Sequence, residues 1–434
     1  MSYNTPKADK VTTNFIGSIK CNQCGKKIFD KRDVWDRLTY VLNLDTNNAL
    51  DTPGKPVKLG IDDTTRIDIH TLFYESVVNA IYPPANCKGI YKDISVYKIT
   101  INKDIPILCT EDNDIIHINE LRFYIFPYDI AFFAINASWE DIPLDKLNEY
   151  NRIIRNVEHY YHNHISHQFL AILQPVIAIY NASNKAHHIA AEDFQQETIK
   201  DYIKILYKTN KLKCYMIIRI NEETLTTFSP QYTRDNLLYD IATMSDIGSS
   251  TDPQNAYKPS QRYYEHLMEH NKIDCFENWT ALALVDTFCC LMNPFTENKY
   301  DYQYNDMWGN LYFDHLYINT LYIKAFMLST IDNFNTGKNQ TKYNKEFDNF
   351  DYRFNHYNVS YNFLPDLIYK TMRTGMEIDN ELYAIKNQIN THNNKIEQKQ
   401  NTRLNWIMAL LAILTTASIL NDGWEFILKL LSFS

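Results

Sequence analysis

Hydrophobic and polar positions alternate in short runs over the first third of the chain. Three runs rich in β-branched residues are separated by Asn-Lys-Asp and Glu-Asp-Asn, which is typical of strands joined by turns. These runs are Val96–Ile101, Ile105–Cys109 and Ile115–Ile118. Residues 121–136 predict two more strands. Pro127 and Asp129 fit a turn between them, because proline cannot donate a hydrogen bond to a sheet.

This pattern predicts a mixed α/β cytoplasmic domain over residues 21–140. The segment before it, residues 1–20, is predicted to be a flexible N-terminus, because its first 14 residues are polar and offer little to bury.

Beyond residue 140 the apolar positions recur mostly at the period of a helix. Residues 143–167, 263–292 and 311–334 are predicted helices, and residues 213–220 are a predicted lone strand. Residues 141–370 are therefore predicted to form a mainly helical cytoplasmic region.

A narrow apolar stripe marks residues 371–403 as a stalk helix. Its members follow the heptad spacing 4-3-4-7 and are Ile378, Leu382, Ile385, Ile389 and Ile396. Most other positions there are polar, and such a stripe suits a helix that meets other helices along one line. We therefore predict a homo-oligomer held by this stalk.

The stalk leads into an apolar run at residues 404–420, and no charged residue occurs from 404 to 421. At about 1.5 Å per residue the run spans about 26 Å, slightly less than the ~30 Å hydrocarbon layer. Trp406 and Trp424 lie near its ends, and Arg403 and other basic residues precede it. The run predicts a transmembrane helix, with a buried core helix as the alternative. Residues 421–434 are a short amphipathic or second membrane segment.

The composition argues against several classes of function. The formal charge is −9, from 43 basic and 52 acidic residues, which argues against direct nucleic-acid binding. With only 10 glycines, the chain lacks the glycine-rich dinucleotide, P-loop and nucleophile-elbow motifs. No apolar leader precedes the eight cysteines, so the thiols are expected to be reduced in the cytosol.

The segment Gln400–Leu420 resembles the first membrane helix of CorA-type divalent-cation channels. The matching positions are Asn401, Asn405, Met408, Leu411 and Thr415. The family's Gly-Met-Asn signature is missing, and Asn-Asp-Gly-Trp stands at residues 421–424 instead. The resemblance implies an α+β fold: an N-terminal mixed α/β cytoplasmic domain, a helical middle region, and a long stalk helix that runs into a transmembrane helix.

CorA-like proteins that lack this signature resemble membrane effectors of type III CRISPR antiviral systems. The resemblance implies a non-enzymatic channel in the inner membrane of a prokaryote, with most of the chain in the cytoplasm. A nucleotide second messenger, such as an S-adenosylmethionine–AMP conjugate, would activate it, and a pentamer is the favoured assembly. The alternative within this class is an ordinary magnesium-type transporter with a divalent cation as the permeant ion.

The predicted pore-lining residues are Asn401, Asn405, Met408, Thr415, Thr416 and Asp422. The alternative for Thr415 and Thr416 is that their hydroxyls donate hydrogen bonds to carbonyls of their own helix.

Two cysteines at the start of the α/β region form a C-x-x-C-G knuckle. Cys21 and Cys24 match half of a structural zinc site, which needs two more ligands. Single candidates for those ligands are Cys87, Cys109 and His70. The alternative is a pair of reduced thiols in a turn.

A second metal candidate is the H-x-x-E-H motif formed by His266, Glu269 and His270. On a helix the two histidines share a face, and the glutamate can activate water in a zinc hydrolase, with Glu346 as a third ligand. A weaker candidate is His159 with His162, one turn apart, for which a solvated helix face is the alternative.

Overall fold

The computed structural model describes residues 6–44, 54–59, 72–84, 87, 89–108, 115–156, 165–184, 211–220, 232–277, 279–292, 313–335 and 340–432. The chain forms two compact units, Met1–Ile378 and Asp379–Ser434.

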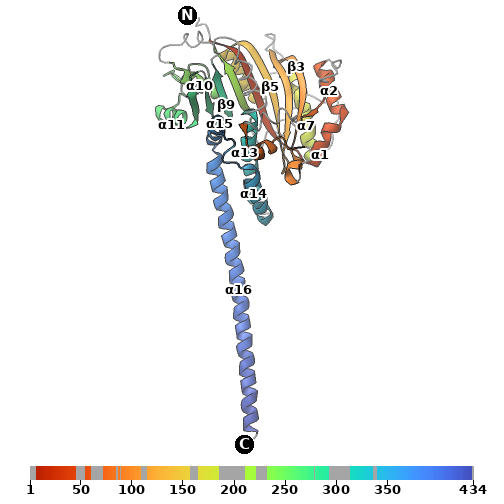
Figure 1. The fold of residues 1–434 in the computed structure, drawn as a ribbon, viewed down its shortest axis with the longest axis vertical. Helices are drawn as coiled ribbons and strands as arrows, with labels where there is room; N and C mark the ends of the chain where they lie inside the picture. Colours follow the sequence, from red (N-terminus) through yellow and green to blue (C-terminus); the bar gives the residue numbers. More distant parts are fainter. Residues whose placement is uncertain are drawn as a thin grey trace. The chain divides into compact units, whose positions relative to one another are not determined.

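One nine-stranded sheet organises the first unit, in the order β2-β3-β4-β5-β1-β6-β9-β8-β7 (Figure 1). Its strands are β1 (Lys7–Lys20), β2 (Val57–Leu59), β3 (Ser95–Pro106), β4 (Ile115–Ile125), β5 (Ile130–Pro143), β6 (Lys213–Arg219), β7 (Lys272–Phe276), β8 (Trp279–Ala283) and β9 (Thr287–Met292). Strands β6 and β9 are parallel, and the other neighbours are antiparallel. The fold is therefore α+β with a mixed sheet.

The N-terminal strand β1 lies at the centre of this sheet, between β5 and β6. The prediction of a flexible N-terminus at residues 1–20 is therefore wrong. Val11, Phe15 and Ile19 point into the apolar core, and the other face of the strand carries Thr12, Asn14 and Ser18. A strand with one polar face offers few apolar positions, and the sequence resembles a solvated tail for that reason.

The sheet also crosses the predicted domain boundary at residue 140, because β6 to β9 belong to the region predicted as mainly helical. Residues 263–292, predicted as one helix, contain the end of a helix followed by three strands. Strand β8 is buried throughout and β9 nearly so. Strands buried on both faces lose their alternation and read as continuous apolar runs, which a helix also produces.

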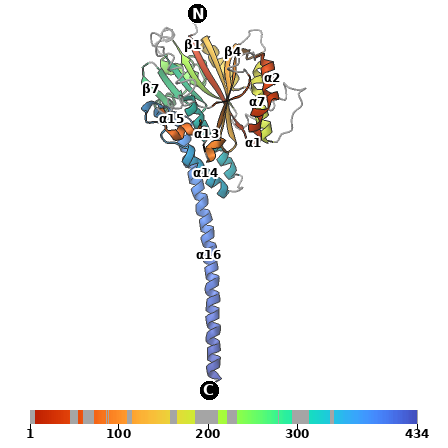
Figure 2. The ribbon, with the colours of Figure 1, turned by 45° about the vertical axis from the view of Figure 1, so that its right-hand side comes forward.

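Helices cover both faces of the sheet (Figure 2). The larger core lies on one face and includes side chains of α2 (Arg32–Leu42), α5 (Leu144–Arg155), α7 (His167–Asn184), α10 (Arg234–Ala242) and α11 (Gln261–Asn271). The short helix α1 (Gln23–Lys26) packs against α7. Helix α13 (Phe313–Asn335) packs on the opposite face, where Tyr317 contacts Tyr215 of β6 and Phe288 of β9. The remaining helices of this unit are α4 (Glu75–Asn79), α14 (Gln340–Phe354), α15 (Phe363–Gly375), and the 3-10 helices η1 (Lys27–Asp30) and η2 (Gly89–Asp93).

The hairpin between β4 and β5 confirms the predicted turn around Pro127 and Asp129. Tyr128 and Asp129 adopt positive φ angles of 64° and 60°, and the Phe126 amide donates to the Ile130 carbonyl at 2.9 Å. Asp tolerates this left-handed conformation better than most residues do, which allows the tight reversal.

The second unit consists of helix α16, which spans Ile378–Leu431 and also includes the last residue of the first unit. The helix continues through residues 421–423, where a turn was predicted. Within the predicted seam, Ile378, Leu382, Ile385 and Ile389 are buried and Ile396 is half-buried. The homo-oligomer that this seam predicts is untested and stays a prediction.

Among the residues that the structure describes, no helix combines the length and apolar character needed to cross a membrane. The predicted transmembrane helix at 404–420 is therefore wrong. The predictions of a membrane protein, of an ion channel and of an inner-membrane location depended on it and are wrong as well.

A carboxylate between β8 and β9 joins three elements of the first unit. Asp286 forms ion pairs with Arg155 at the end of α5 and with Lys213 at the start of β6. Burial raises the pKa of Asp286, but the two cations outweigh burial and hold the pKa below its usual value. The charged form of Asp286 therefore stabilises the fold.

We expect Asp286→Asn to lower the free energy of unfolding by about 1 kcal/mol at pH 7, because the ion pairs are partly exposed to solvent. A folded-state pKa below the unfolded one stabilises the protein above the unfolded pKa, and that stability is lost as pH falls through the folded pKa. The difference between variant and wild type should therefore shrink below about pH 4. Urea denaturation at several pH values measures it. The control is Asp141→Asn, whose partner Lys7 forms an exposed pair; an equal effect of both variants would contradict the prediction.

Candidate functional site

A polar cleft of about 770 Å³ opens on the face of the sheet opposite the larger core. Strands β1, β3, β4, β5 and β6 form its floor. Its lining residues are Lys10, Thr12, Asp104, Ile115, His117, Asn119, Glu120, Asn136, Ser138, Trp139, Glu140 and Ile217. A cleft of this size can hold a small-molecule ligand.

The strand register aligns these side chains in rows across the sheet. One row runs through five strands and contains Asp104, His117, Ser138, Thr12 and Ile217. Side chains directly opposite each other on antiparallel strands lie about 5 Å apart, so each row presents neighbouring polar groups to one ligand.

The next row carries a chain of amide side chains. Asn14, Asn136 and Glu120 are cross-strand neighbours in this row. The Asn136 Nδ2 donates to Asn14 Oδ1 at 2.6 Å, and Asn119 Nδ2 donates to Asn136 Oδ1 at 2.7 Å. Each amide thus fixes the orientation of the next, which gives the floor of the cleft a defined pattern of donors and acceptors.

A β-bulge explains why two consecutive residues, Asn119 and Glu120, both line the cleft. Consecutive side chains of a regular strand point to opposite faces. The register of β4 against β5 shifts between Ile118 and Glu120, which leaves Asn119 as the extra residue. Such a bulge turns an additional side chain toward the site.

His117 is held on the β3 side of the cleft. Its Nδ1 lies 2.7 Å from Asp104 Oδ1, and its Nε2 lies 3.1 Å from Asn102 Oδ1. Both ring nitrogens are therefore engaged away from Ser138, the cross-strand neighbour of His117 on β5. This histidine does not activate the Ser138 hydroxyl as a nucleophile, so the row suits binding better than acyl transfer.

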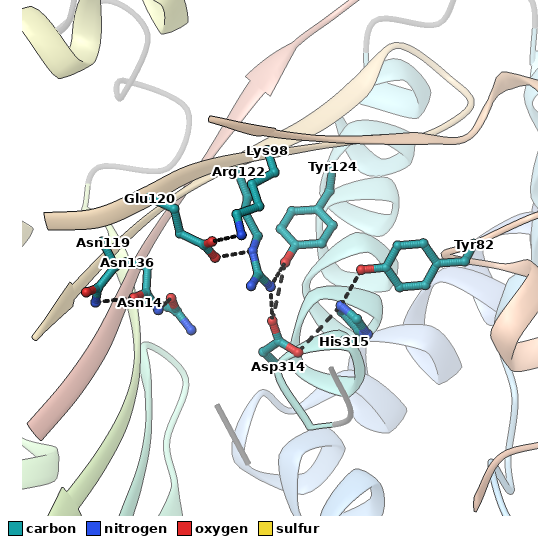
Figure 3. A network of polar contacts seen from close by, with 10 residues as sticks. All are labelled: Asn14, Tyr82, Lys98, Asn119, Glu120, Arg122, Tyr124, Asn136, Asp314 and His315. Atoms are coloured by element: carbon teal, nitrogen blue, oxygen red, sulfur yellow. Dashed lines mark hydrogen bonds and ion pairs between the residues drawn. The ribbon is translucent and has the colours of Figure 1, made fainter. Parts of the chain in front are cut away.

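Glu120 connects the cleft to a buried charge network (Figure 3). It is 7% exposed, and its Oε2 lies 3.1 Å from Lys98 Nζ. Its Oε1 pairs with Arg122 Nε, and Arg122 Nη1 reaches Asp314 Oδ2 on α13 at 3.1 Å. Two carboxylates and two cations therefore alternate from the cleft to the helix, with no net charge among the four.

Aromatic and imidazole groups complete this network beneath α13 (Figure 3). The Tyr124 hydroxyl donates to Asp314 Oδ2 at 3.3 Å, and His315 Nε2 lies 2.8 Å from the Tyr82 hydroxyl. Burial raises the pKa of both tyrosines, so they remain neutral. Burial disfavours the charge of Arg122, but its acidic neighbours outweigh burial and raise the pKa of its guanidinium.

The predicted cysteine knuckle has a different local role. Asn22 caps α1 by accepting from the Cys24 and Gly25 amides at 2.9 and 3.2 Å. Cys21 is buried, and burial raises its thiol pKa to about 12, whereas Cys24 is exposed. In the described part of the chain no group of three or more Cys, His, Asp or Glu side chains is arranged to hold a metal ion. Zinc binding at this knuckle stays a prediction.

The H-x-x-E-H motif lies on the exposed side of α11. The rings of His266 and His270 are 4.3 Å apart, and Glu269 lies 3.9 Å from His270. The proposed third ligand, Glu346, is on α14 and lies 3.6 Å from Lys342. Within the described ranges, the motif therefore offers a pair of exposed histidines without a third ligand beside them.

Several of the residues predicted as metal ligands cannot be assigned to a site. His159, His162, His70 and Cys109 lie outside the described residues.

Of the residues assigned to a pore, Thr415 and Thr416 donate hydrogen bonds to the Leu411 and Ala412 carbonyls at 2.7–2.9 Å, which is the alternative given for them above. Asn401, Asn405 and Met408 are exposed, and the side chain of Asp422 is not described. Without a membrane helix, the pore assignment of these six residues has no basis.

Removing the cation at the centre of the network should destabilise the first unit. We expect Arg122→Met to lower the free energy of unfolding by about 3–5 kcal/mol, because Asp314 then remains buried without its ion-pair partner. Urea denaturation measures the loss.

The matched control is Arg262→Met at an exposed position of α11, which should change stability by less than about 0.5 kcal/mol. Adding Asp314→Asn to Arg122→Met should restore part of the loss, since it removes the uncompensated charge. Equal stability of the two single variants would refute this role of Arg122.

Comparison with known proteins adds no relative to this description. No protein-family model matches the chain, and neither a curated protein nor a solved structure matches it.

Proposed function

We propose that the chain is a ligand-responsive effector that binds a nucleotide second messenger in the polar cleft and performs no bond chemistry itself. The observation that carries this proposal is the row of oriented amides on the floor of a 770 Å³ cleft. Side-chain amides pair with the edges of nucleobases through adjacent donors and acceptors.

The charges around the amides also suit a nucleotide. Lys10 lines the cleft and can pair with phosphate oxygens. Asp104, Glu120 and Glu140 line the same cleft and can accept hydrogen bonds from ribose hydroxyls or amino groups. The cleft thus supplies the hydrogen-bonding and charged groups that a nucleotide requires.

Binding is better supported than the alternative of zinc hydrolysis. A catalytic zinc site keeps three protein ligands and one open position. The exposed pair His266 and His270 supplies two ligands, and the described residues place no third one beside them. No observation at this helix therefore favours a hydrolase over a ligand sensor.

Asn136 is the residue whose loss should weaken ligand binding most cleanly, because it bridges two other amides in the row. We expect Asn136→Ala to weaken the affinity for the tightest-binding nucleotide at least about tenfold, which corresponds to ~1.4 kcal/mol. Isothermal titration calorimetry with a panel of mono- and dinucleotides, including an S-adenosylmethionine–AMP conjugate, measures the affinities.

The control is Asn184→Ala at an exposed position of α7, which should leave affinity unchanged. If no nucleotide of the panel binds the wild-type chain, or if both variants bind equally well, the cleft is not a nucleotide site.

We also propose that the effector is a homo-oligomer assembled through α16. Eight apolar side chains between residues 404 and 414 of this helix are more than half exposed: Leu404, Trp406, Ile407, Met408, Leu410, Leu411, Ile413 and Leu414. Contiguous apolar surface of this extent marks an interaction site. A helix that is apolar on all sides is normally surrounded by other helices, and further copies of α16 would supply them.

Polar substitutions in this segment should reduce the size of the assembly. We expect the triple variant Leu410→Gln, Leu411→Gln and Leu414→Gln to have a smaller molar mass in solution than the wild type, because the apolar contacts between copies are lost. Size-exclusion chromatography with light scattering measures the mass.

The control replaces three exposed polar residues of the same helix with alanine, Asn387, Gln388 and Asn390. A wild-type chain that is monomeric at all concentrations would refute the proposal.

A further inference from the structure

We propose that Glu120 selects the ligand of the cleft: it favours a heteroaromatic ring with a neutral amino group over the same ring with an oxo group at that position. This inference rests on the proposed nucleotide function and names the part of the ligand that the cleft recognises.

Glu120 is the cleft residue whose position is most firmly determined. It is 7% exposed, and each of its carboxylate oxygens already pairs with one cation, Lys98 or Arg122. Those two pairs hold the carboxylate in one orientation at the edge of the cleft. A ligand therefore meets a fixed group and not a mobile surface side chain.

The chemistry of an ionised carboxylate restricts what can be placed against it. A carboxylate only accepts hydrogen bonds, and its two oxygens have about four lone-pair sites in total. Arg122 pairs with Oε1, which is buried, so Oε2, which Lys98 contacts, is the oxygen that a ligand would meet. An amino group donates to a remaining lone pair of Oε2, whereas an oxo group places its own lone pairs against it and is repelled.

The charge balance of the network distinguishes a neutral amino group from a cationic one. Glu120 and Asp314 are matched by Lys98 and Arg122, so the four side chains carry no net charge. A full positive charge placed against Glu120 would be unbalanced in a region where these residues are mostly buried, and that is costly. The amino group of a nucleobase donates hydrogen bonds without adding charge.

The neighbouring amides recognise the ring beside that amino group. Asn119 precedes Glu120 at the bulge, and Asn136 is the cross-strand neighbour of Glu120. An asparagine amide offers one donor and one acceptor side by side, which matches a ring nitrogen next to an amino group. A carboxylate and two amides at one point of the floor therefore recognise the amino edge of a base such as adenine.

The test compares ligands that differ only at this position. AMP and IMP have the same ring system and phosphate, with an amino group in one and an oxo group in the other. We expect the full-length wild-type chain to bind AMP at least about tenfold more tightly than IMP by calorimetry, because the amino group donates to Glu120 whereas the oxo group places its lone pairs against those of the carboxylate. In Glu120→Gln the ratio should fall to about one or reverse, because glutamine can also donate.

Two controls separate this inference from the function on which it rests. Glu265→Gln removes an exposed carboxylate of α11, outside the cleft, and should keep the preference for AMP. The wild-type ratio needs no variant, so it decides the question even if Glu120→Gln unfolds the protein. Equal binding of AMP and IMP, both weakened by Asn136→Ala, would overturn the selection by Glu120 and leave the nucleotide site standing. Failure of both nucleotides to bind at millimolar concentration would overturn both proposals.

Discussion

The ion pair between Arg122 and Asp314 is the interaction on which the rest of the first unit depends. It joins β4 to the first turn of α13, and both residues are buried. Buried charges are tolerated only when they are paired and hydrogen-bonded. The position of α13 over the sheet is therefore coupled to the geometry of a single guanidinium, and the aromatic contacts of Tyr317 with β6 and β9 add apolar packing along the same helix.

The cleft exists because α13 covers only part of its face of the sheet. Under the helix, that face carries buried groups such as Tyr124 and Tyr215. Further along the strands the same face carries Thr12, Asn136 and His117, which line the cleft. Solvent-facing positions of an antiparallel sheet are normally polar. Here the polar side chains are also linked to one another, because cross-strand register brings amides into hydrogen-bond distance, and this order distinguishes a binding floor from an ordinary wet surface.

Parts of this arrangement were predictable from the sequence, and the reasons for the failures are physical. The β4–β5 hairpin and helix α13 were predictable, because a turn signal and a long apolar periodicity are local properties. Strand β1 was missed because half of its residues are polar, and β7 to β9 were missed because buried strands lose their alternation. The transmembrane prediction relied on an apolar run with tryptophans near its ends and basic residues before it, and the described helix does not meet the requirements for crossing a membrane.

The residues of the cleft could not be predicted from the sequence, for a different reason. Its residues come from positions as far apart as Thr12, Asp104 and Ile217, and only the pairing of five strands brings them into one row. Alternation counted from His117 would have assigned Glu120 to the wrong face, because the bulge at Asn119 is not encoded in a recognisable motif.

The position of Glu120 has a consequence for how the cleft and the helix communicate. The same guanidinium that pairs with Glu120 at the edge of the cleft also holds Asp314 at the start of α13. Hydrogen bonds in a chain of polar groups polarise one another, so a donor placed against Glu120 weakens its hold on Arg122 and leaves more of the guanidinium's charge to Asp314. Occupation of the cleft and attachment of α13 thus share one side chain, and any coupling between them is limited by the energy of that shared pair, typically about 1–3 kcal/mol.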